Sequence, residues 1–238
     1  YVGYIVGDGS VRLANERYRL SSVSAVFGTE QEAQELLPEF TRLFNEWGVR
    51  DYQHLMMPNG TVQLRINRTP VARMLAGIGV STKKAPEKVV PYSIFQSPQA
   101  IQTAFLRGLF TADGCVYEGE KSRYVGLGSA SKELLQGVQR LLHGHGIFSR
   151  IYATRRVSQN SFRYTKKDGT TVTYTPHPSY DLRISGRSIA RFNDRIGFLI
   201  AVKQNKLTHV VNNHSFYQTE DDSVHLQSLE YAGKEFTY

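Results

Sequence analysis

Cysteine is nearly absent from this chain, which has one such residue in 238. A single cysteine cannot form an intrachain disulfide or a zinc site built from several cysteines, and it fits a reducing compartment. No apolar run approaches the roughly 18–20 residues that span a membrane. A signal peptide and an initiating methionine are also missing, since the chain opens with Tyr1. We therefore expect an intracellular protein, not secreted and without a membrane partner, with Tyr1 as the cut edge of something longer.

Negative charge is also scarce. Lysine and arginine number 29 against 21 aspartates and glutamates, so the net charge is +8 and the pI is about 9.5. This balance predicts an anionic partner, nucleic acid first, although a basic metabolic enzyme stays open as an alternative at this point. Hydrophobic residues make up 40% of the chain, which is enough for a core, and the length allows one large domain or two of ordinary size.

What the chain does contain is an internal repeat. The N-terminal segment YVGYIVGDGS matches LRGLFTADGCV in the middle of the chain, which aligns Asp8 with Asp113 at an offset of 105 residues. Further along each half, the sequence Leu-Arg-Ile occurs at 64–66 and again at 182–184, an offset of 118 residues. The same offset aligns Lys88 with Lys206. Offsets that stay constant over many positions indicate two copies of one structural unit.

The repeat divides the chain into a first unit at 1–97, a second unit at 98–215 and a polar, acidic tail at 216–238. Each unit reads as a helix ending in Asp-Gly, strands, a helix, strands, a helix and a basic segment. The larger offset in the second unit places an insertion around 150–180, where alternating residues on either side of a Lys-Asp-Gly turn predict a projecting β-ribbon. A linker between the units is expected at Gln96–Gln102.

Small residues recur four positions apart in both Asp-Gly helices, so that the two helices can pack with their backbones close together. A glycine after each aspartate can end the helix, which places Asp8 and Asp113 at two neighbouring C-terminal ends. A carboxylate at the negative end of a helix dipole is unfavourable unless a cation compensates it, and oxygen ligands favour Mg²⁺ over Zn²⁺. The predicted helix-interface residues are Gly3, Gly7, Gly108 and Ala112.

These motifs resemble those of the LAGLIDADG homing endonucleases of the double-motif, monomeric type found in inteins. The segment FLRGLFTADG at 105–114 is a specific form of the motif, and IGFLIAVKQNKL at 196–207 is also typical of the family. The end of the tail, GKEFTY, resembles the start of the returning segment of an intein splicing domain. The resemblance implies an α+β fold of two pseudo-symmetric αββαββα repeats. Each would form a saddle-shaped antiparallel sheet, and the two would join through the Asp-Gly helices.

The resemblance also implies an activity: hydrolysis of both strands of a long, pseudo-palindromic double-stranded DNA target, leaving short 3′ overhangs. The cofactor would be Mg²⁺, with Mn²⁺ or Ca²⁺ able to substitute for binding. The chain would act as a monomer in the manner of a pseudo-dimer, without an obligate protein partner, and be fused to an intein splicing domain. A non-cleaving nucleic-acid binder of the same fold, either a transcription regulator or an RNA-splicing maturase, is the alternative, and the two intact aspartates argue against it.

The implied site residues follow from the aligned motifs. Lys83, Lys84 and Lys203 compete with the two aligned lysines for a catalytic role. The implied catalytic residues are Asp8, Asp113, Lys88 and Lys206, and the implied metal ligands are Asp8, Asp113, Gly7 and Ala112.

Strand alternation predicts the surface that faces DNA, because polar side chains share one face of each strand. Arginine, lysine and amide side chains on such a face suit base edges and phosphates. The predicted DNA-binding residues are Arg17, Arg19, Ser21, Gln63, Arg65, Asn67, Arg155, Arg156, Arg163, Lys166, Lys167, Arg183 and Ser185.

Overall fold

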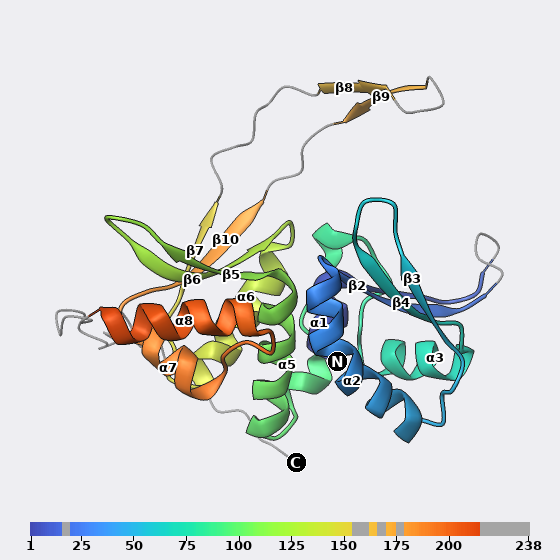
Figure 1. The fold of residues 1–238 in the computed structure, drawn as a ribbon, viewed down its shortest axis with the longest axis horizontal. Coiled ribbons are helices and arrows are strands. Elements are labelled where there is room, and N and C mark those ends of the chain that lie inside the picture. Colours follow the sequence, from blue (N-terminus) through green and yellow to red (C-terminus); the bar gives the residue numbers. More distant parts are fainter. Residues whose placement is uncertain (16–19, 154–161, 166–169, 175–178, 215–238) are drawn as a thin grey trace, which may run out of the picture.

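The structure is a computed structural model and describes residues 1–15, 20–153, 162–165, 170–174 and 179–214. The fold is α+β, as predicted, with two four-stranded antiparallel sheets whose helices lie on one side (Figure 1). The first unit contains α1 (Val2–Asp8), β1 (Gly9–Arg12), β2 (Ser22–Phe27), α2 (Glu30–Glu46), β3 (Tyr52–Met56), β4 (Val62–Ile66), α3 (Thr69–Gly77), the 3₁₀ turn η1 (Ala85–Glu87) and α4 (Tyr92–Phe95). The second contains α5 (Gln99–Asp113), β5 (Gly114–Glu118), β6 (Arg123–Ser129), α6 (Lys132–Gly144), β7 (Arg150–Ala153), β8 (Phe162–Thr165), β9 (Thr171–Tyr174), β10 (Tyr180–Ile184), α7 (Arg187–Arg195) and α8 (Ala201–Asn213).

The two sheets repeat one topology. Their strand orders are β1-β2-β4-β3 and β5-β6-β10-β7, and every neighbouring pair is antiparallel. One edge strand of each sheet follows directly from a motif helix. Strand β1 begins where α1 ends, and β5 begins where α5 ends. The repeat in the sequence is therefore a repeat in space, and the two sheets lie on either side of the paired motif helices (Figure 1).

Alternation along the strands decides which face is covered. In β4, Val62, Leu64 and Ile66 are almost fully buried, while Gln63 and Arg65 are only half-buried. This pattern is that of a strand with one face against helices and the other open. The preceding hairpin turns at Asn59-Gly60, and the backbone of Gly60 has φ +83°, which a glycine adopts without steric cost.

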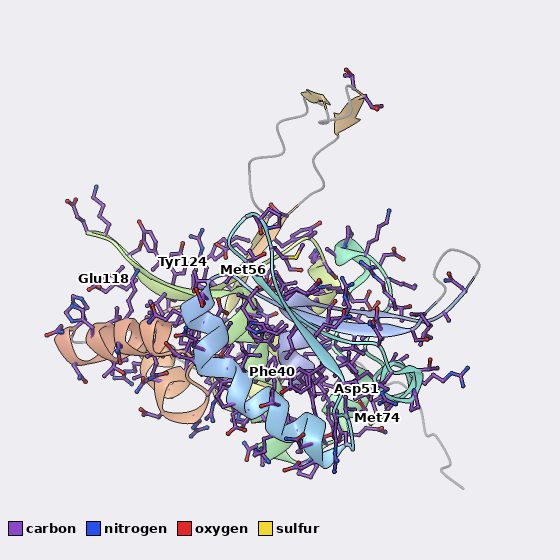
Figure 2. The ribbon with its side chains drawn as sticks, turned by 45° about the vertical axis from the view of Figure 1, so that its right-hand side comes forward. Phe40, Asp51, Met56, Met74, Glu118 and Tyr124 are labelled. Atoms are coloured by element: carbon purple, nitrogen blue, oxygen red, sulfur yellow. The ribbon has the colours of Figure 1, made fainter. Side chains whose placement is uncertain are left out.

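Helix α2 covers the buried face of the first sheet. The hydroxyl of Thr29 accepts a hydrogen bond from Glu32 N at 3.1 Å and so fixes the start of the helix. Leu36, Phe40 and Phe44 recur at helical spacing and are at most 2% exposed. Phe40 lies in the interior among the rings that α2 packs under the sheet (Figure 2). The buried face of α2 thereby holds the sheet whose first strand leads out of the motif helix.

The motif helices pack at the centre with almost no space between their backbones. A Cβ on Gly3 would lie 1.9 Å from the carbonyl oxygen of Phe105, and a Cβ on Gly108 would lie 3.0 Å from Tyr4 N. No side chain fits at the first of these positions, which gives the physical reason for glycine there. The two units are therefore joined through the helices that end in Asp-Gly.

Some expected segments differ from the structure or lie outside it. The predicted linker at Gln96–Gln102 is mostly wrong, because α5 begins at Gln99 and takes up the end of that range. Within the insertion around 150–180, β8 and β9 pair antiparallel, with Phe162 opposite Tyr174. The tail at 216–238 lies outside the described residues. Within the described residues, no helix combines the length and the apolar character that crossing a membrane requires.

Candidate functional site

The two aspartates of the motifs meet where α1 and α5 end. A Cβ on Gly7 would lie 2.7 Å from the Cβ of Ala112 and 3.1 Å from a carboxylate oxygen of Asp113. This close approach places the last turn of each helix against the other, with Asp8 and Asp113 side by side. Both residues are exposed at the surface. The sequence prediction that these two residues come together agrees with this geometry.

The surroundings of Asp113 change the pKa of its carboxyl. The pKa of the Asp113 carboxyl is raised to about 7, chiefly by burial and secondly by the negative charge of Asp8, while the charge of Lys88 opposes both effects. Two carboxylates that resist being charged together favour the binding of a cation between them. Their open edge leaves room for such a cation and for water to arrive.

Lys88 lies beside the first motif. Its Nζ donates a hydrogen bond of 2.6 Å to the carbonyl oxygen of Gly7, one residue before Asp8. The Lys88 backbone is held by the second unit, because the hydroxyl of Ser131 donates to the Lys88 carbonyl at 2.6 Å. Burial lowers the pKa of the Lys88 ammonium, and the charges of Asp113 and Asp8 partly restore it. The site therefore holds a lysine whose proton is less tightly bound than usual.

At the second motif the equivalent lysine is Lys203, not the predicted Lys206. The Nζ of Lys203 donates to the carbonyl oxygens of Thr111 at 2.6 Å and Ala112 at 3.0 Å. Burial also lowers the pKa of this ammonium, with the charge of Glu32 as the main opposing cause. Lys206 lies three residues further along α8 and is exposed. The structure thus gives the two aspartates one lysine each, arranged with the same local symmetry as the motif helices.

The helix that carries Lys203 begins against the first unit. The backbone N–H of Ala201, in the first turn of α8, donates to a carboxylate oxygen of Glu35 in α2 at 2.6 Å. A carboxylate at a helix N-terminus satisfies an unpaired N–H and complements the dipole. The sequence analysis missed Glu35, since nothing in its local sequence separates it from the other glutamates of α2.

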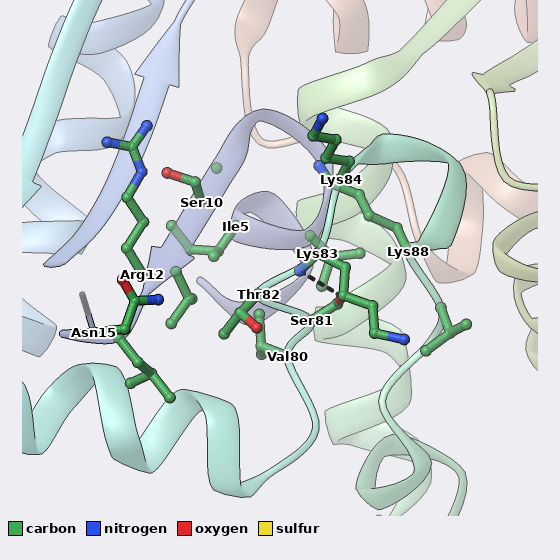
Figure 3. Close-up of a pocket in the computed structure, with 15 residues that line it drawn as sticks. Ile5, Ser10, Arg12, Asn15, Val80, Ser81, Thr82, Lys83, Lys84 and Lys88 are labelled. Carbon is green, nitrogen blue, oxygen red and sulfur yellow. Dashed lines mark hydrogen bonds between the residues drawn. The ribbon is translucent and has the colours of Figure 1, made fainter. Parts of the chain in front are cut away.

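A basic cavity of about 300 Å³ opens beside Lys88 (Figure 3). Strand β1 contributes Ser10 and Arg12 to its wall, and the segment before η1 contributes Lys83 and Lys84. The two lysines that compete with Lys88 in the sequence therefore line a neighbouring space, and no hydrogen bond among the described residues joins them to a motif carbonyl. Their charges add to the positive potential next to the paired aspartates.

The predicted DNA-binding residues fall into four groups, three of which concern the first sheet or lie outside the described residues. Gln63, Arg65 and Asn67 lie on the open side of β4 or just after it, and Arg65 Nη2 donates to Gln63 Oε1 at 2.8 Å. Ser21 does not belong to this surface: it is 3% exposed, and its hydroxyl accepts from Ala14 N. The predicted residues Arg17, Arg19, Arg155, Arg156, Lys166 and Lys167 lie outside the described residues, as does the side chain of Arg163 in β8.

On the second sheet, Ser185 follows β10 and is exposed, whereas Arg183 is half-buried on the open face. Its guanidinium lies over the ring of Tyr124, with the ring centroid 4.5 Å away, and over Tyr152 at 5.0 Å. The sequence analysis did not include these tyrosines. Tyrosine alternating with buried valine and leucine along β6 is the signal that would have placed Tyr124 on the open face.

Comparison with known proteins agrees with this geometry. Residues 100–197 match the family described as LAGLIDADG-like domain. The chain is 28% identical to the ribonucleoside-diphosphate reductase NrdEB subunit alpha of Bacillus subtilis (strain 168), over all of this chain but 22% of that protein. It is 27% identical to a DNA polymerase of Thermococcus hydrothermalis, over 96% of this chain and 13% of the polymerase. The chain thus spans a small part of the length of these curated relatives.

Solved structures share the architecture over most of this chain. A mesophilic variant of the homing endonuclease I-DmoI has a TM-score of 0.61 at 19% identity, over 87% of this chain and 94% of that one. I-DmoI in complex with DNA and Ca has a TM-score of 0.60 at 20% identity, over 90% and 95% of the two chains. I-DmoI has also been solved in complex with DNA and Mn, at a TM-score of 0.59. These likenesses establish the fold, and it is the fold that the resemblance of the motifs implied.

Proposed function

We propose that this chain, which has the double-motif LAGLIDADG fold and a LAGLIDADG-like domain in its second unit, is a site-specific, metal-dependent endonuclease for double-stranded DNA. The observation that carries this proposal is the meeting of Asp8 and Asp113 at the ends of two glycine-packed helices, each next to a motif carbonyl bonded to a lysine. Two such centres side by side suit the cutting of two antiparallel strands by one chain.

The donor atoms fit Mg²⁺. The carboxylates of Asp8 and Asp113 would hold the metal. The carbonyl oxygens of Gly7 and Ala112 each accept a hydrogen bond from a lysine and would offer the metal their second lone pair. The described residues hold no cluster of three or more histidine, cysteine, aspartate or glutamate side chains, so further ligands would come from DNA phosphate and water. Mg²⁺ commonly takes one or two carboxylates, keeps several waters and uses substrate phosphates. When bound, it would lower the pKa of water and neutralise charge on the phosphate that is cut.

The remaining chemistry belongs to the two lysines. Lys88 and Lys203 have lowered pKa values because of burial, so each can exchange a proton with a nearby water more readily than an exposed lysine. While protonated, each ammonium is a fixed positive charge close to where the phosphate would lie. Their hydrogen bonds to Gly7, Ala112 and Thr111 hold the two charges in place before DNA arrives.

The open faces of the two sheets would lie along the DNA major groove, the first with Gln63 and Arg65 and the second with Arg183. Because the two faces carry different side chains, the target would be long and only pseudo-palindromic. We further propose that the breaks leave short 3′ overhangs. The chain would act as a monomer, with its two units in the roles of a dimer.

Matches that cover all of this chain but a small part of a reductase subunit or a DNA polymerase support an inserted module. We propose that the chain is such a module within an intein, and that the tail at 216–238 leads toward a splicing domain.

Cleavage of a plasmid library with Mg²⁺ tests the proposal. Wild type should produce double-strand breaks at one sequence. Asp8→Asn and Asp113→Asn should each lower the cutting rate on the order of a hundredfold or more, since each removes a charged oxygen ligand. Asp194→Asn, on the exposed side of α7 beside Asn193, is the matched control and should cut like wild type. Sequence-specific binding without metal-dependent cutting would support the regulator or maturase alternative, and unchanged cutting by both motif variants would refute the assigned centre.

A further inference from the structure

The guanidinium of Arg183 is fixed in one orientation on the open face of the second sheet. Its Nε donates to Asp181 Oδ2 at 2.6 Å, two residues earlier on β10. The rings of Tyr124 and Tyr152 lie over it, and they come from β6 and β7, the strands on either side of β10. Figure 2 shows Tyr124 on the strand surface away from the helices. The orientation is thus set from three sides by neighbouring strands and by β10 itself.

These contacts leave one edge of the group unused. A guanidinium has five N–H donors in a planar fork, and its Nε–H is taken by Asp181. The tyrosine rings lie against its planar surface. No hydrogen bond joins its Nη groups to an acceptor among the described residues, and the side chain is 41% exposed. The free edge therefore presents two parallel donors to the surface.

We infer that Arg183 is a base-reading residue that recognises a guanine, with Asp181, Tyr124 and Tyr152 as positioning residues. This inference rests on the proposed function as a DNA-binding protein. Two parallel donors match the O6 and N7 acceptors that guanine presents in the major groove. A phosphate contact fits less well, because the carboxylate of Asp181 beside the guanidinium neutralises its charge and repels a phosphate.

The neighbouring strand leaves room for a base to approach. Gly126 and Gly128 of β6 stand opposite Arg183 and Asp181 in the sheet register, so they share the same open face. A Cβ added to Gly128 would meet nothing within 4 Å. At Gly126, opposite Arg183, a Cβ would lie 3.1 Å from both Cys115 Sγ and the Tyr124 ring, so the open space is the one at Gly128, opposite Asp181. The edge of a base can reach the two donors from that end of the pair.

The equivalent arginine of the first unit is built differently. Arg65 aligns with Arg183 in the sequence repeat, but its Nη2 donates to Gln63 Oε1 at 2.8 Å. One of the two donors that Arg183 keeps free is therefore already used in Arg65. The guanine reader belongs to the second unit alone, which makes the two halves of the recognised sequence different.

Selection from a randomised duplex DNA library, in buffer with Ca²⁺, tests the inference. Wild type should enrich a sequence with a required guanine, and replacing that guanine should weaken binding about ten- to one-hundredfold. Arg183→Ala and Arg183→Lys should lose the preference at this one position and keep the others, since a lysine cannot donate in parallel. Asp181→Asn should weaken the same preference. Gly128→Val should fold, because a Cβ at this position meets nothing within 4 Å, and should lower the affinity because the valine occupies the space through which the base approaches Arg183.

Arg140→Ala removes the same charge from the exposed side of α6, where the arginine lies over Phe95, and should leave the selected sequence unchanged. The inference is overturned if both Arg183 variants keep every guanine of the wild-type sequence. A uniform loss of affinity for all sequences would also overturn it, because that result identifies a phosphate contact. If wild type itself enriches no sequence, the proposed function fails, and that outcome is seen before any variant is compared.

Discussion

At the scale of single residues, the second motif distinguishes two lysines that lie three positions apart. Lys203 donates to Thr111 and Ala112, whereas Lys206 is exposed. We expect Lys203→Met to slow single-turnover DNA cleavage on the order of a hundredfold, the lower end of what a positioned proton-transfer group contributes. Lys206→Met is the matched control and should change the rate severalfold at most. Equal losses in the two variants, measured at saturating enzyme, would contradict the assignment.

His145 makes the stability of the protein depend on pH. The residue is 2% exposed, and no hydrogen-bond partner of its Nε2 lies within the described residues. Burial, and secondly the charge of Arg195, lower its pKa below the ordinary 6.5. The unfolded chain therefore takes up the proton first, so the stability that is complete above pH 6.5 is lost as the pH falls through 6.5 toward the lowered value. The urea concentration at the midpoint of unfolding should therefore decrease between pH 7.5 and pH 5.5, and it should decrease more for wild type than for His145→Gln. An equal fall in both would refute this role.

At the scale of elements, the contact between α1 and α5 depends on one missing side chain. Gly3→Ala would put a Cβ 1.9 Å from the Phe105 carbonyl oxygen, so the helices must separate. We expect a loss of about 1–3 kcal/mol in the free energy of unfolding, as for other overpacked contacts. Gly144→Ala at the exposed end of α6 is the control, because a Cβ there meets nothing within 4 Å. It should stabilise the protein by about 0.5–1 kcal/mol. Urea unfolding measures both, and a neutral Gly3→Ala would refute the tight contact.

The elements also show what the sequence could predict. The repeat and the Asp-Gly motifs predicted the order of helices and strands, because both follow from local pattern and glycine positions. The lysine of the second motif could not be predicted from the offset. Lys88 follows a short 3₁₀ turn and extended backbone, while Lys203 lies within α8. The two units therefore reach the motif carbonyls along different backbone paths, so a constant residue offset does not carry one lysine onto the other.

At the scale of the whole molecule, each unit helps to position the lysine-bearing segment of the other. Ser131, at the start of α6, holds the backbone of Lys88, and Glu35 of α2 holds the first turn of α8, which carries Lys203. These contacts join residues far apart in the chain, so no local pattern predicts them. They link the two lysines proposed to act in catalysis to the packing of the units.

The positive charge of the whole molecule should appear as salt-dependent binding. With a net charge of +8, DNA association should release counterions, so the logarithm of the binding constant should fall linearly with the logarithm of the salt concentration. Lys84 is exposed at the cavity beside Lys88. As a phosphate contact, it should contribute about 1 to that slope, and Lys84→Gln should remove this contribution and weaken binding evenly across sequences. Lys132→Gln, at the exposed start of α6, is the matched control and should keep the slope. An unchanged slope for Lys84→Gln in a salt titration would place the phosphate path away from this cavity.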